Sequence, residues 1–389
     1  MNDHIPRSKD DDYAAPIIRA RQEFVKEKTG AAFKHVDKYS IDPGTLRGNV
    51  ESFLGTAQVP LGLAGPLLVD GEYAQGEFYV PMATTEGTLV ASYNRGMKLA
   101  HACGGVRTTI VDDAMNRAPV FMFDDAREAK KFNAWLDENY EAIKREAEKT
   151  TSVGKLKGLE RYAVGKLFFV RFNFTTGDAA GQNMVGKATF AACEWIRASY
   201  PAVRHYNLSG NIDTDKKTSF INTLNTRGKR VIAEINLRAD LISGLAKFPA
   251  GELLRQRNIT NTGAILAGSN NNGMHSANGI TAVFIATGQD AANVAESSAA
   301  LVYSDQAPGD SSYYFSITIP SLIVGTYGGG TGLATQRECL EMLGCYGAGK
   351  VNKFAEIVAA TVLCGELSLL SAVLAGDWVS SHEKMGRNR

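Results

Sequence analysis

Hydrophobic and polar positions follow two different periods along this chain, and these periods predict a mixture of strands and helices. Residues 167–174 (LFFVRFNF) are rich in β-branched and aromatic side chains, and residues 230–237 (RVIAEINL) alternate like a half-buried strand. Residues 124–149 are highly charged and amphipathic, with acidic capping candidates, and they predict one long exposed helix. Residues 183–199 return to a helical pattern. The fold class is therefore expected to be α+β or mixed α/β.

Two further segments are apolar and almost free of charge. Residues 279–300 and 354–375 predict buried helices. Residues 354–374 are also the best candidate for a membrane span, but the segment contains Glu356 and Glu366. Charged side chains are costly in a bilayer, so we interpret this segment as the central buried helix of a large domain and expect no membrane association.

The same patterns suggest how the chain is divided. Residues 1–50 are charged and mixed, and they predict an N-terminal helical arm. Residues 60–66 (PLGLAGP) are punctuated by Pro and Gly and predict a turn region, which precedes a helix over 85–102. A strand–helix unit predicts a small α/β domain over 113–213, inserted into a large domain formed by 51–112 and 214–389.

Composition narrows the function classes. The 389 residues are 44% hydrophobic and 21% charged, with a formal net charge of +1, which argues against a partner such as nucleic acid. The five cysteines are scattered and odd in number, which favours a reducing compartment over disulfides. The N-terminus has no apolar signal-peptide core, so we expect a cytoplasmic enzyme. No His/Glu spacing suggests a zinc site, and we expect no metal.

The densest polar segment of the chain is residues 209–217 (SGNIDTDKK). Such a loop can bind a carboxylate, polarise a carbonyl and hold an ammonium group beside acidic neighbours. Taken alone, it is equally well explained as a solvated surface loop. Its interpretation depends on what else the chain contains.

Three isolated residues are candidates for proton and charge chemistry. Glu86 lies at or within the first turn of its predicted helix, where a glutamate is usually structural. Asp290 falls in the predicted buried helix and needs a partner, for which Lys216 is the obvious candidate; the alternatives are an exposed face or a cap. His382 lies in the tail, where a histidine usually has no role but can act as a late-arriving general acid. His275 lies in a polar segment and is a further candidate for ligand contact.

Residues 181–188 (GQNMVGKA) have the G-x-x-x-x-G-K spacing of a phosphate-binding loop, between a predicted strand and a predicted helix. The position after the lysine is Ala188 instead of Ser or Thr, so the hydroxyl that binds magnesium is missing. This argues against an ATPase and leaves phosphate recognition without magnesium. Residues 325–331 (GTYGGGT) are also glycine-rich and permit close approach of a flat or phosphorylated ligand.

Together, these segments resemble the 3-hydroxy-3-methylglutaryl-coenzyme A (HMG-CoA) reductase family. The matching motifs occur in family order from about Asn49 to the end: PLGLAGPL, ATTEGTLVASYNRG, TTGDAAGQNM, SGNIDTDKK, SANGITAVFIATGQDAANV, IPSLIVGTYGGGTGLATQ, GELSLLSAVLAG and SHEKMGR. The ATTEG, DKK and GQD set is similar to the class that includes the eukaryotic catalytic domains, and we expect this protein to lack the membrane anchor of those members. The resemblance implies reduction of HMG-CoA to mevalonate and CoA by two hydrides from NADH or NADPH.

The resemblance also implies roles for individual residues. Lys216 matches the lysine that stabilises the developing oxyanion, and Glu86 matches the glutamate that supplies a proton to the mevaldehyde intermediate. Asp290 matches the aspartate that links these two, and His382 matches the histidine that protonates the CoA thiolate. The implied contacts of the hydroxymethylglutaryl group are Arg117, Ser209, Asp215, Lys217 and Asn278, and those of CoA are Ser92, Asn94 and Arg95.

The resemblance further implies a ferredoxin-like fold for the inserted nucleotide-binding domain, and active sites shared between subunits of a homodimer or dimer of dimers. The implied dinucleotide contacts are Asp178, Gly181, Gln182, Asn183, Tyr327, Gly328, Gly329 and Gly330.

Three departures from the family pattern bear on the cofactor and on regulation. Members that use NADPH often have an arginine near the 2′-phosphate, whereas residues 151–155 (TSVGK) around Ser152 contain none. Lys155 or Lys157 are possible substitutes, but the loss favours NADH modestly. The family's GDAMGMNM reads GDAAGQNM here, and Asn388 stands where animal enzymes carry a regulatory serine.

Three questions stay open at this point. The reaction can run in the oxidative direction, consuming mevalonate. An enzyme of the same fold acting on another acyl-CoA is one rival hypothesis, and a nucleotide-binding ATPase or regulatory module is the other.

Overall fold

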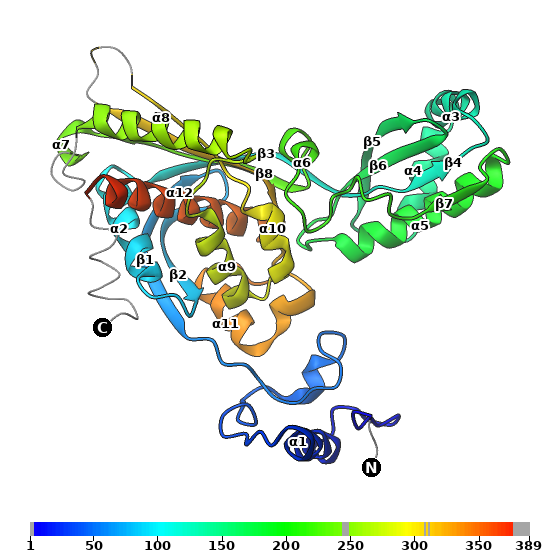
Figure 1. The fold of residues 1–389 in the computed structure, drawn as a ribbon, viewed down its shortest axis with the longest axis horizontal. Coiled ribbons are helices and arrows are strands. Elements are labelled where there is room, and N and C mark those ends of the chain that lie inside the picture. Colours follow the sequence, from blue (N-terminus) through cyan, green and yellow to red (C-terminus); the bar gives the residue numbers. More distant parts are fainter. Residues whose placement is uncertain (1–3, 243–248, 307–308, 310–311, 376–389) are drawn as a thin grey trace.

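The computed structural model describes residues 4–242, 249–306, 309 and 312–375, which form an N-terminal arm and two packed units (Figure 1). Each unit has its own hydrophobic cluster. The larger cluster surrounds α12 (Val351–Ala375), and the smaller one includes the buried face of α5 (Gln182–Ser199). The arm carries α1 (Ala15–Thr29), whose Ile18 packs with Leu46 and Phe53. The mixed α/β class expected from the sequence is confirmed.

The remaining elements are as follows. The strands are β1 (Leu61–Gly71), β2 (Gln75–Ala83), β3 (Val106–Arg117), β4 (Val120–Met122), β5 (Lys155–Val164), β6 (Leu167–Thr175), β7 (His205–Asn207), β8 (Gly228–Leu237), β9 (Leu301–Asp305) and β10 (Tyr313–Leu322). The helices are α2 (Leu89–Ala102), α3 (Ala126–Glu138), α4 (Tyr140–Glu148), α6 (Phe220–Leu224), α7 (Ala239–Leu241), α8 (Ala250–Leu266), α9 (Ser276–Thr287), α10 (Val294–Ser297) and α11 (Ala334–Met342), with 3₁₀ turns at Pro43–Leu46, Ala291–Asn293 and Gly329–Gly332.

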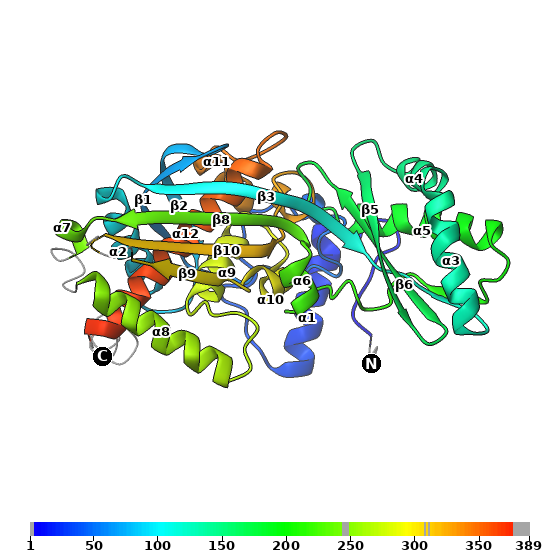
Figure 2. The same ribbon diagram turned by 90° about the horizontal axis from the view of Figure 1, so that it is seen from above.

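The strand β3 joins the two units. Its first part pairs antiparallel with β8 from Arg107 to Ala114, and its last three residues pair with β6 of the small unit. The sheet therefore runs continuously in the order β7-β4-β6-β3-β8-β10-β9, and Figure 2 shows β3 passing from the large unit into the small one. The loop that carries the polar segment follows β7 and lies where the two units meet.

The helix α12 is the centre of the large unit, as its apolar sequence predicts. It contacts α2, α9, β8 and β10. The segment Val351–Leu374 is long and apolar enough to cross a membrane by composition, but 78% of its most apolar window is buried against the protein. Its two glutamates are also satisfied internally. Glu356 accepts hydrogen bonds from the main-chain N–H groups of residues 72–74, and Glu366 accepts from those of residues 274–276.

Two predictions of local structure are wrong: one predicted turn region is a strand, and one predicted helix is two helices. Residues 60–66 form no turn region, because residues 61–66 lie in β1, where residues 61–64 pair with β2 and an irregularity follows before pairing resumes at Leu67. The charged segment 124–149 is two helices, since Asn139 interrupts the helix and its Nδ2 donates to the carbonyl of Trp135 at 2.9 Å.

Two further helices have different boundaries from those expected. The helix α2 begins at Leu89, after Thr88 in a left-handed conformation, so Glu86 precedes the helix. The helix α9 ends at Thr287 because Gly288 adopts φ 70°, so Asp290 follows the buried helix instead of lying within it. Both differences place a candidate catalytic side chain on a loop.

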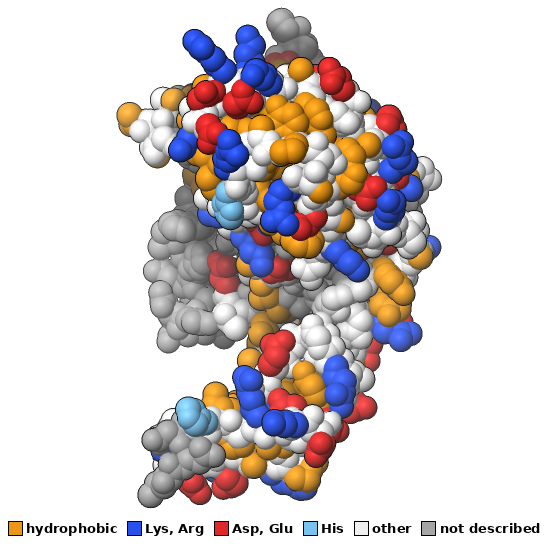
Figure 3. All heavy atoms as spheres, turned by 90° about the vertical axis from the view of Figure 1, so that its right-hand side faces the viewer, with side chains coloured by type: hydrophobic (Ala, Val, Ile, Leu, Met, Phe, Trp, Pro, Cys, Tyr) orange, Lys and Arg blue, Asp and Glu red, His pale blue; other side chains and the backbone are white. Residues whose placement is uncertain are grey.

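The surface of the small unit carries charges of both signs. In Figure 3, which views the molecule from the side of this unit, Lys and Arg side chains are interspersed with Asp and Glu. The charged helices α3 and α4 contribute to this pattern through ion pairs between neighbouring turns, such as Lys131–Glu128 and Lys149–Glu146.

Candidate active site

The polar segment 209–217 adopts an unusual backbone conformation. Asn211, Thr214 and Lys216 have φ values of 65°, 49° and 58°, in the left-handed region that residues other than glycine rarely adopt. Side-chain contacts hold the segment in place: Asn222 donates to the Thr214 hydroxyl at 2.6 Å, and Thr214 shares a hydrogen bond with Ser219 at 2.8 Å. A disfavoured backbone that is held by its surroundings is common at functional sites.

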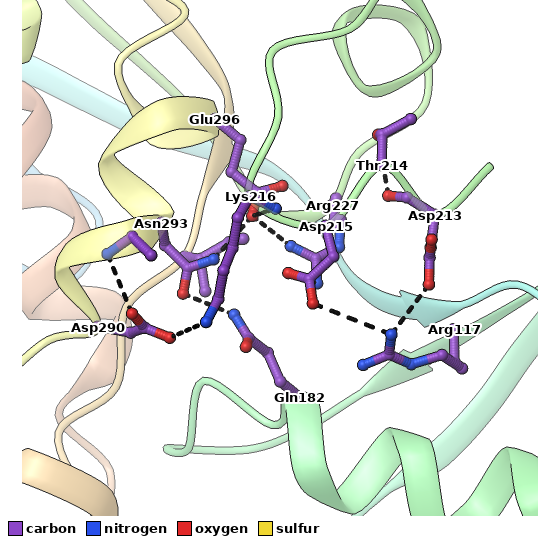
Figure 4. A network of polar contacts seen from close by, with 12 residues as sticks. Arg117, Gln182, Asp213, Thr214, Asp215, Lys216, Arg227, Asp290, Asn293 and Glu296 are labelled. Carbon is purple, nitrogen blue, oxygen red and sulfur yellow. Dashed lines mark hydrogen bonds and ion pairs between the residues drawn. The ribbon is translucent and has the colours of Figure 1, made fainter. Parts of the chain in front are cut away.

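Lys216 and Asp290 form the ion pair that the sequence led us to expect. Lys216 Nζ lies 2.9 Å from Asp290 Oδ2, and the two side chains are 42% and 43% exposed (Figure 4). Asp290 also caps the 3₁₀ turn that follows it, accepting from the N–H of Ala292 at 3.0 Å. The capping alternative is therefore also present, because one carboxylate oxygen caps the turn while the other meets the ammonium group.

A buried charged cluster lies behind this pair. Arg227 is fully buried and bridges Asp215, at 2.8 Å, and Glu296, with which it makes a short ion pair. Asp215 Oδ2 in turn lies 3.9 Å from Arg117, which also binds Asp213 at 3.0 Å. Burial raises the pKa of Glu296, and the Arg227 guanidinium opposes that shift. The cluster joins the polar loop to both units.

Sequence reasoning missed part of this cluster. Asp213 lies inside the polar segment and could have been found by treating every carboxylate there as a candidate. Arg227 and Glu296 gave no signal, because each is an ordinary charged residue among polar or small neighbours. Only the fold shows that both are buried.

The other expected substrate contacts in the loop pair locally. The Ser209 hydroxyl donates to Asp213 at 3.2 Å, and Lys217 Nζ lies 3.0 Å from the side-chain oxygen of Asn211. Lys217 is exposed, so its ammonium group is accessible to an anionic ligand. The loop thus presents two lysines with different surroundings, one paired with Asp290 and the other with a neutral amide.

Glu86 lies beside α9. Its carboxylate accepts from Asn278 Nδ2 at 3.3 Å, and its own N–H donates to the Thr84 hydroxyl at 3.0 Å. Glu86 is exposed, and among the residues that the structure describes no hydrogen bond or ion pair joins it to Lys216 or Asp290. The fourth candidate, His382, lies outside the described residues.

Two of the three candidates on α2, Ser92 and Arg95, contact Ser368 of α12. The Ser92 hydroxyl lies 3.2 Å from His275 Nε2 and 3.1 Å from the Ser368 hydroxyl, which also accepts from Arg95 Nε at 3.0 Å. Burial, together with the nearby Arg95 charge, lowers the pKa of His275 to about 4, so this ring is neutral at physiological pH. Asn94 instead accepts from the N–H of Gly65, at 2.7 Å. Sequence reasoning missed Ser368.

The two glycine-containing segments expected at a dinucleotide site meet in the structure. The N–H of Thr326 donates to the carbonyl of Asp178 at 2.8 Å, and a Cβ at Gly325 would lie only 2.8 Å from Ala180 N. The helix α5 begins at Gln182, directly after Gly181 in a left-handed conformation. The expected strand–turn–helix context of this segment is therefore present.

Within these segments, the side chains of Asp178 and Gln182 have partners inside the protein, whereas Asn183 and Tyr327 are exposed. The Asp178 carboxylate is occupied by the N–H groups of residues 349–351, at 2.8–3.1 Å, so it caps the start of α12. Gln182 Nε2 donates to Asn293 Oδ1 at 2.6 Å, while Asn183 is exposed. Tyr327, at the start of the 327–330 segment, is 66% exposed.

The 327–330 segment has an open backbone surface at two of its glycines. A Cβ added at Gly328 or Gly329 would meet no atom within 4 Å, and both residues have positive φ values, of 82° and 58°. Gly330 instead packs against Gly288, where a Cβ would lie 2.6 Å from the carbonyl oxygen. The segment is therefore closely packed at Gly330 and open at Gly328 and Gly329.

Comparison with known proteins relates the whole chain to one family. The family model described as hydroxymethylglutaryl-coenzyme A reductase matches residues 17–387. The 3-hydroxy-3-methylglutaryl-coenzyme A reductase of Methanocaldococcus jannaschii is 44% identical over 94% of this chain and 92% of its own length. That of Drosophila melanogaster is 42% identical over 92% of this chain, which spans 39% of the fly protein.

A solved structure gives the fold comparison. The class II 3-hydroxy-3-methylglutaryl-CoA reductase of Streptococcus pneumoniae, determined with bound NADPH in open conformations, superposes with a TM-score of 0.70. The alignment covers 92% of this chain and 97% of that chain, at 18% sequence identity. At this identity the comparison supports the fold.

Proposed function

The chain belongs to the hydroxymethylglutaryl-coenzyme A reductase family, and we propose that the contact of Lys216 with Asp290 is the centre of its active site. The enzyme reduces HMG-CoA to mevalonate and CoA with hydride from a nicotinamide cofactor. The 2.9 Å ion pair carries the proposal, because it joins two loops that are 74 residues apart, next to the charged cluster around Arg227. Nicotinamide oxidation that depends on HMG-CoA tests the activity directly.

The protein residues have distinct proposed roles. A bound nicotinamide cofactor supplies the hydride. Lys216 directs its ammonium group at the thioester carbonyl and stabilises the negative charge that develops on oxygen. Asp290 fixes the position of that ammonium group. Glu86, which Asn278 orients, donates a proton to the oxygen of the mevaldehyde intermediate. His382 protonates the departing CoA thiolate.

Substrate positioning follows from the charges around these groups. Arg117 and Lys217 are the proposed partners of the hydroxymethylglutaryl carboxylate, together with Ser209, Asp215 and Asn278. Ser92, Asn94 and Arg95 are the proposed CoA contacts. Arg95 supports this assignment because it is a cation on the helix that follows Glu86, and its Nε is held by Ser368.

We assign the nicotinamide cofactor to the small unit, residues 113–213, and to the 327–330 segment. The open backbone at Gly328 and Gly329 fits a flat ring, and Asp178 ties this region to α12. We propose a preference for NADH over NADPH. Lys155 and Lys157, the possible partners of a 2′-phosphate, each contact a carboxylate: Lys155 meets Glu148 at 3.1 Å, and Lys157 meets Asp112 at 2.9 Å. The 2′-phosphate of NADPH must therefore compete with a carboxylate for either lysine.

Three finer assignments are also proposals. The class I-like expectation is not right for the neighbours in fold, since one of them is described as a class II enzyme. We propose a class I-like assignment from the sequence alone, because this chain is 42% identical to the fly relative and 18% identical to that class II enzyme. We propose a homodimer or dimer of dimers; Leu61, Leu63 and Tyr79 on the β1–β2 pair are each more than half exposed and support a subunit contact there. We also propose a cytoplasmic location.

A further inference from the structure

Glu296 is a buried carboxylate that contacts the main chain of the proposed catalytic lysine. It lies on the short helix α10 and is 1% exposed. Its Oε1 accepts from the N–H of Lys216 at 3.1 Å and from Asn293 Nδ2 at 2.7 Å, and it pairs with Arg227 (Figure 4). Its Oε2 is buried and has no hydrogen-bond partner among the described residues. All of the carboxylate's polar contacts are therefore concentrated on the oxygen that meets Lys216.

The backbone of Lys216 needs such a contact. Its φ of 58° is sterically disfavoured for any side chain with a Cβ, and Thr214, two residues earlier, has the same handedness. A return of Lys216 to a right-handed or extended conformation would turn its side chain away from Asp290. The hydrogen bond from Lys216 N to Glu296 Oε1 fixes the peptide that precedes the Lys216 Cα, from which the side chain is oriented, and it satisfies a main-chain donor that the loop leaves without a regular partner.

Arg227 holds both Glu296 and the residue that precedes Lys216. One of its terminal nitrogens pairs with Glu296, and the other binds Asp215, the residue before Lys216, at 2.8 Å. Because Arg227 is fully buried, its guanidinium has little freedom to follow a moving loop. Asn293 extends the cluster to Gln182, which lies at the proposed cofactor site. The catalytic loop is thus attached to a connected set of buried and half-buried polar groups.

We propose that Glu296 is a positioning residue for the reduction of HMG-CoA, and that it acts by holding the Lys216 main chain so that the ammonium group faces Asp290. The inference rests on the proposed role of Lys216. The competing explanation is that Glu296 only neutralises the buried Arg227 charge. The two explanations differ in what they require of the side chain, since positioning requires an acceptor at the right reach, and neutralisation requires a negative charge.

Two conservative substitutions separate reach from charge. Glu296→Gln keeps an acceptor oxygen at the same reach but removes the charge. Glu296→Asp keeps the charge but withdraws it by one carbon–carbon bond, about 1.5 Å, which breaks the contact with Lys216 N. Glu356 offers a matched control, because it is also a buried carboxylate that accepts main-chain N–H groups, at Tyr73 and Ala74, outside the proposed site. Glu356→Asp should lower stability while leaving kcat per folded molecule unchanged.

Steady-state kinetics with HMG-CoA and NADH, normalised to the folded fraction, decide the matter. We expect Glu296→Asp to lower kcat by roughly 10- to 100-fold, as a displacement of about 1 Å does for catalytic groups, with little change in KM for either substrate. Glu296→Gln should retain more of kcat than Glu296→Asp. The opposite order, or equal kcat in both variants, would overturn the inference. If Glu296→Gln does not fold, the contrast between Glu296→Asp and Glu356→Asp still decides, since a similar kcat in both rules positioning out.

The wild-type enzyme separates this inference from the proposed function. If the wild-type protein does not oxidise a nicotinamide cofactor when HMG-CoA is present, the proposed function fails first. If it does so and Glu296→Asp turns over normally, only the positioning inference fails.

Discussion

Replacement of Lys216 by alanine should separate catalysis from stability. The Lys216–Asp290 ion pair is 2.9 Å long, but both side chains are more than 40% exposed, so solvent screens the attraction. Exposed pairs of this kind contribute about 0.2–1 kcal/mol to the free energy of unfolding. Removal of one preorganised group that stabilises an oxyanion typically lowers kcat by about 100- to 1,000-fold, or about 3–4 kcal/mol of transition-state stabilisation. The catalytic effect should therefore exceed the stability effect several times over.

The assay compares urea unfolding with steady-state turnover of HMG-CoA. We expect Lys216→Ala to unfold within about 1 kcal/mol of the wild type and to lose at least about 100-fold in kcat. Lys217→Ala is the control from the same loop, because Lys217 pairs with the amide oxygen of Asn211 and is proposed only to bind substrate. It should raise KM for HMG-CoA more than it lowers kcat. Near-normal kcat in Lys216→Ala, or a loss explained by unfolding, would refute the assignment of Lys216.

Three further predictions follow from the geometry. Asp178→Ala removes the acceptor of three N–H groups at the start of α12 and should lower the free energy of unfolding by about 1–2 kcal/mol while raising KM for the nicotinamide; unchanged urea unfolding would contradict the capping role. Because the pKa of His275 is lowered from 6.5 to about 4, the unfolded chain binds a proton more readily between these values, so stability falls as the pH is lowered through this window. From pH 7 to pH 5 the wild type should lose about 2 kcal/mol relative to His275→Gln, and parallel pH profiles of unfolding would exclude this linkage. Finally, kcat/KM should be higher with NADH than with NADPH, and a strong NADPH preference would show that Lys155 or Lys157 leaves its carboxylate to bind phosphate.

The regular parts of the fold could be predicted because their patterns are local. The strands β6 and β8 and the helices α5 and α12 have the composition and period of their structures over most of their length. The boundaries that failed depend on single residues. Gly288 ends α9 earlier than its apolar run suggests, and Asn139 divides a charged segment whose period is unbroken. These effects of conformation and side-chain hydrogen bonding are invisible to a periodic pattern.

The site could be predicted in part for a similar reason. The sequence predicts a cation partner for Asp290 because it places this carboxylate in a buried helix, and the structure confirms the contact with Lys216. The predicted burial is wrong, since Asp290 follows the helix and is 43% exposed. The support from Arg227 and Glu296 could not be predicted. Whether an arginine or glutamate is buried depends on how β8 and α10 pack, and nothing in the flanking sequence records that. Similarly, the capping role of Asp178 depends on α12, which lies more than 170 residues later.

The stoichiometry of the complete reaction tests the central claim most directly. Purified protein is supplied with HMG-CoA and excess NADH or NADPH, and the oxidised cofactor, free CoA thiol and mevalonate are quantified together. Because a thioester is reduced to an alcohol by four electrons, the account predicts two cofactor molecules oxidised for each CoA and each mevalonate released. Absence of HMG-CoA-dependent oxidation with both cofactors, or release of CoA without mevalonate, would contradict it.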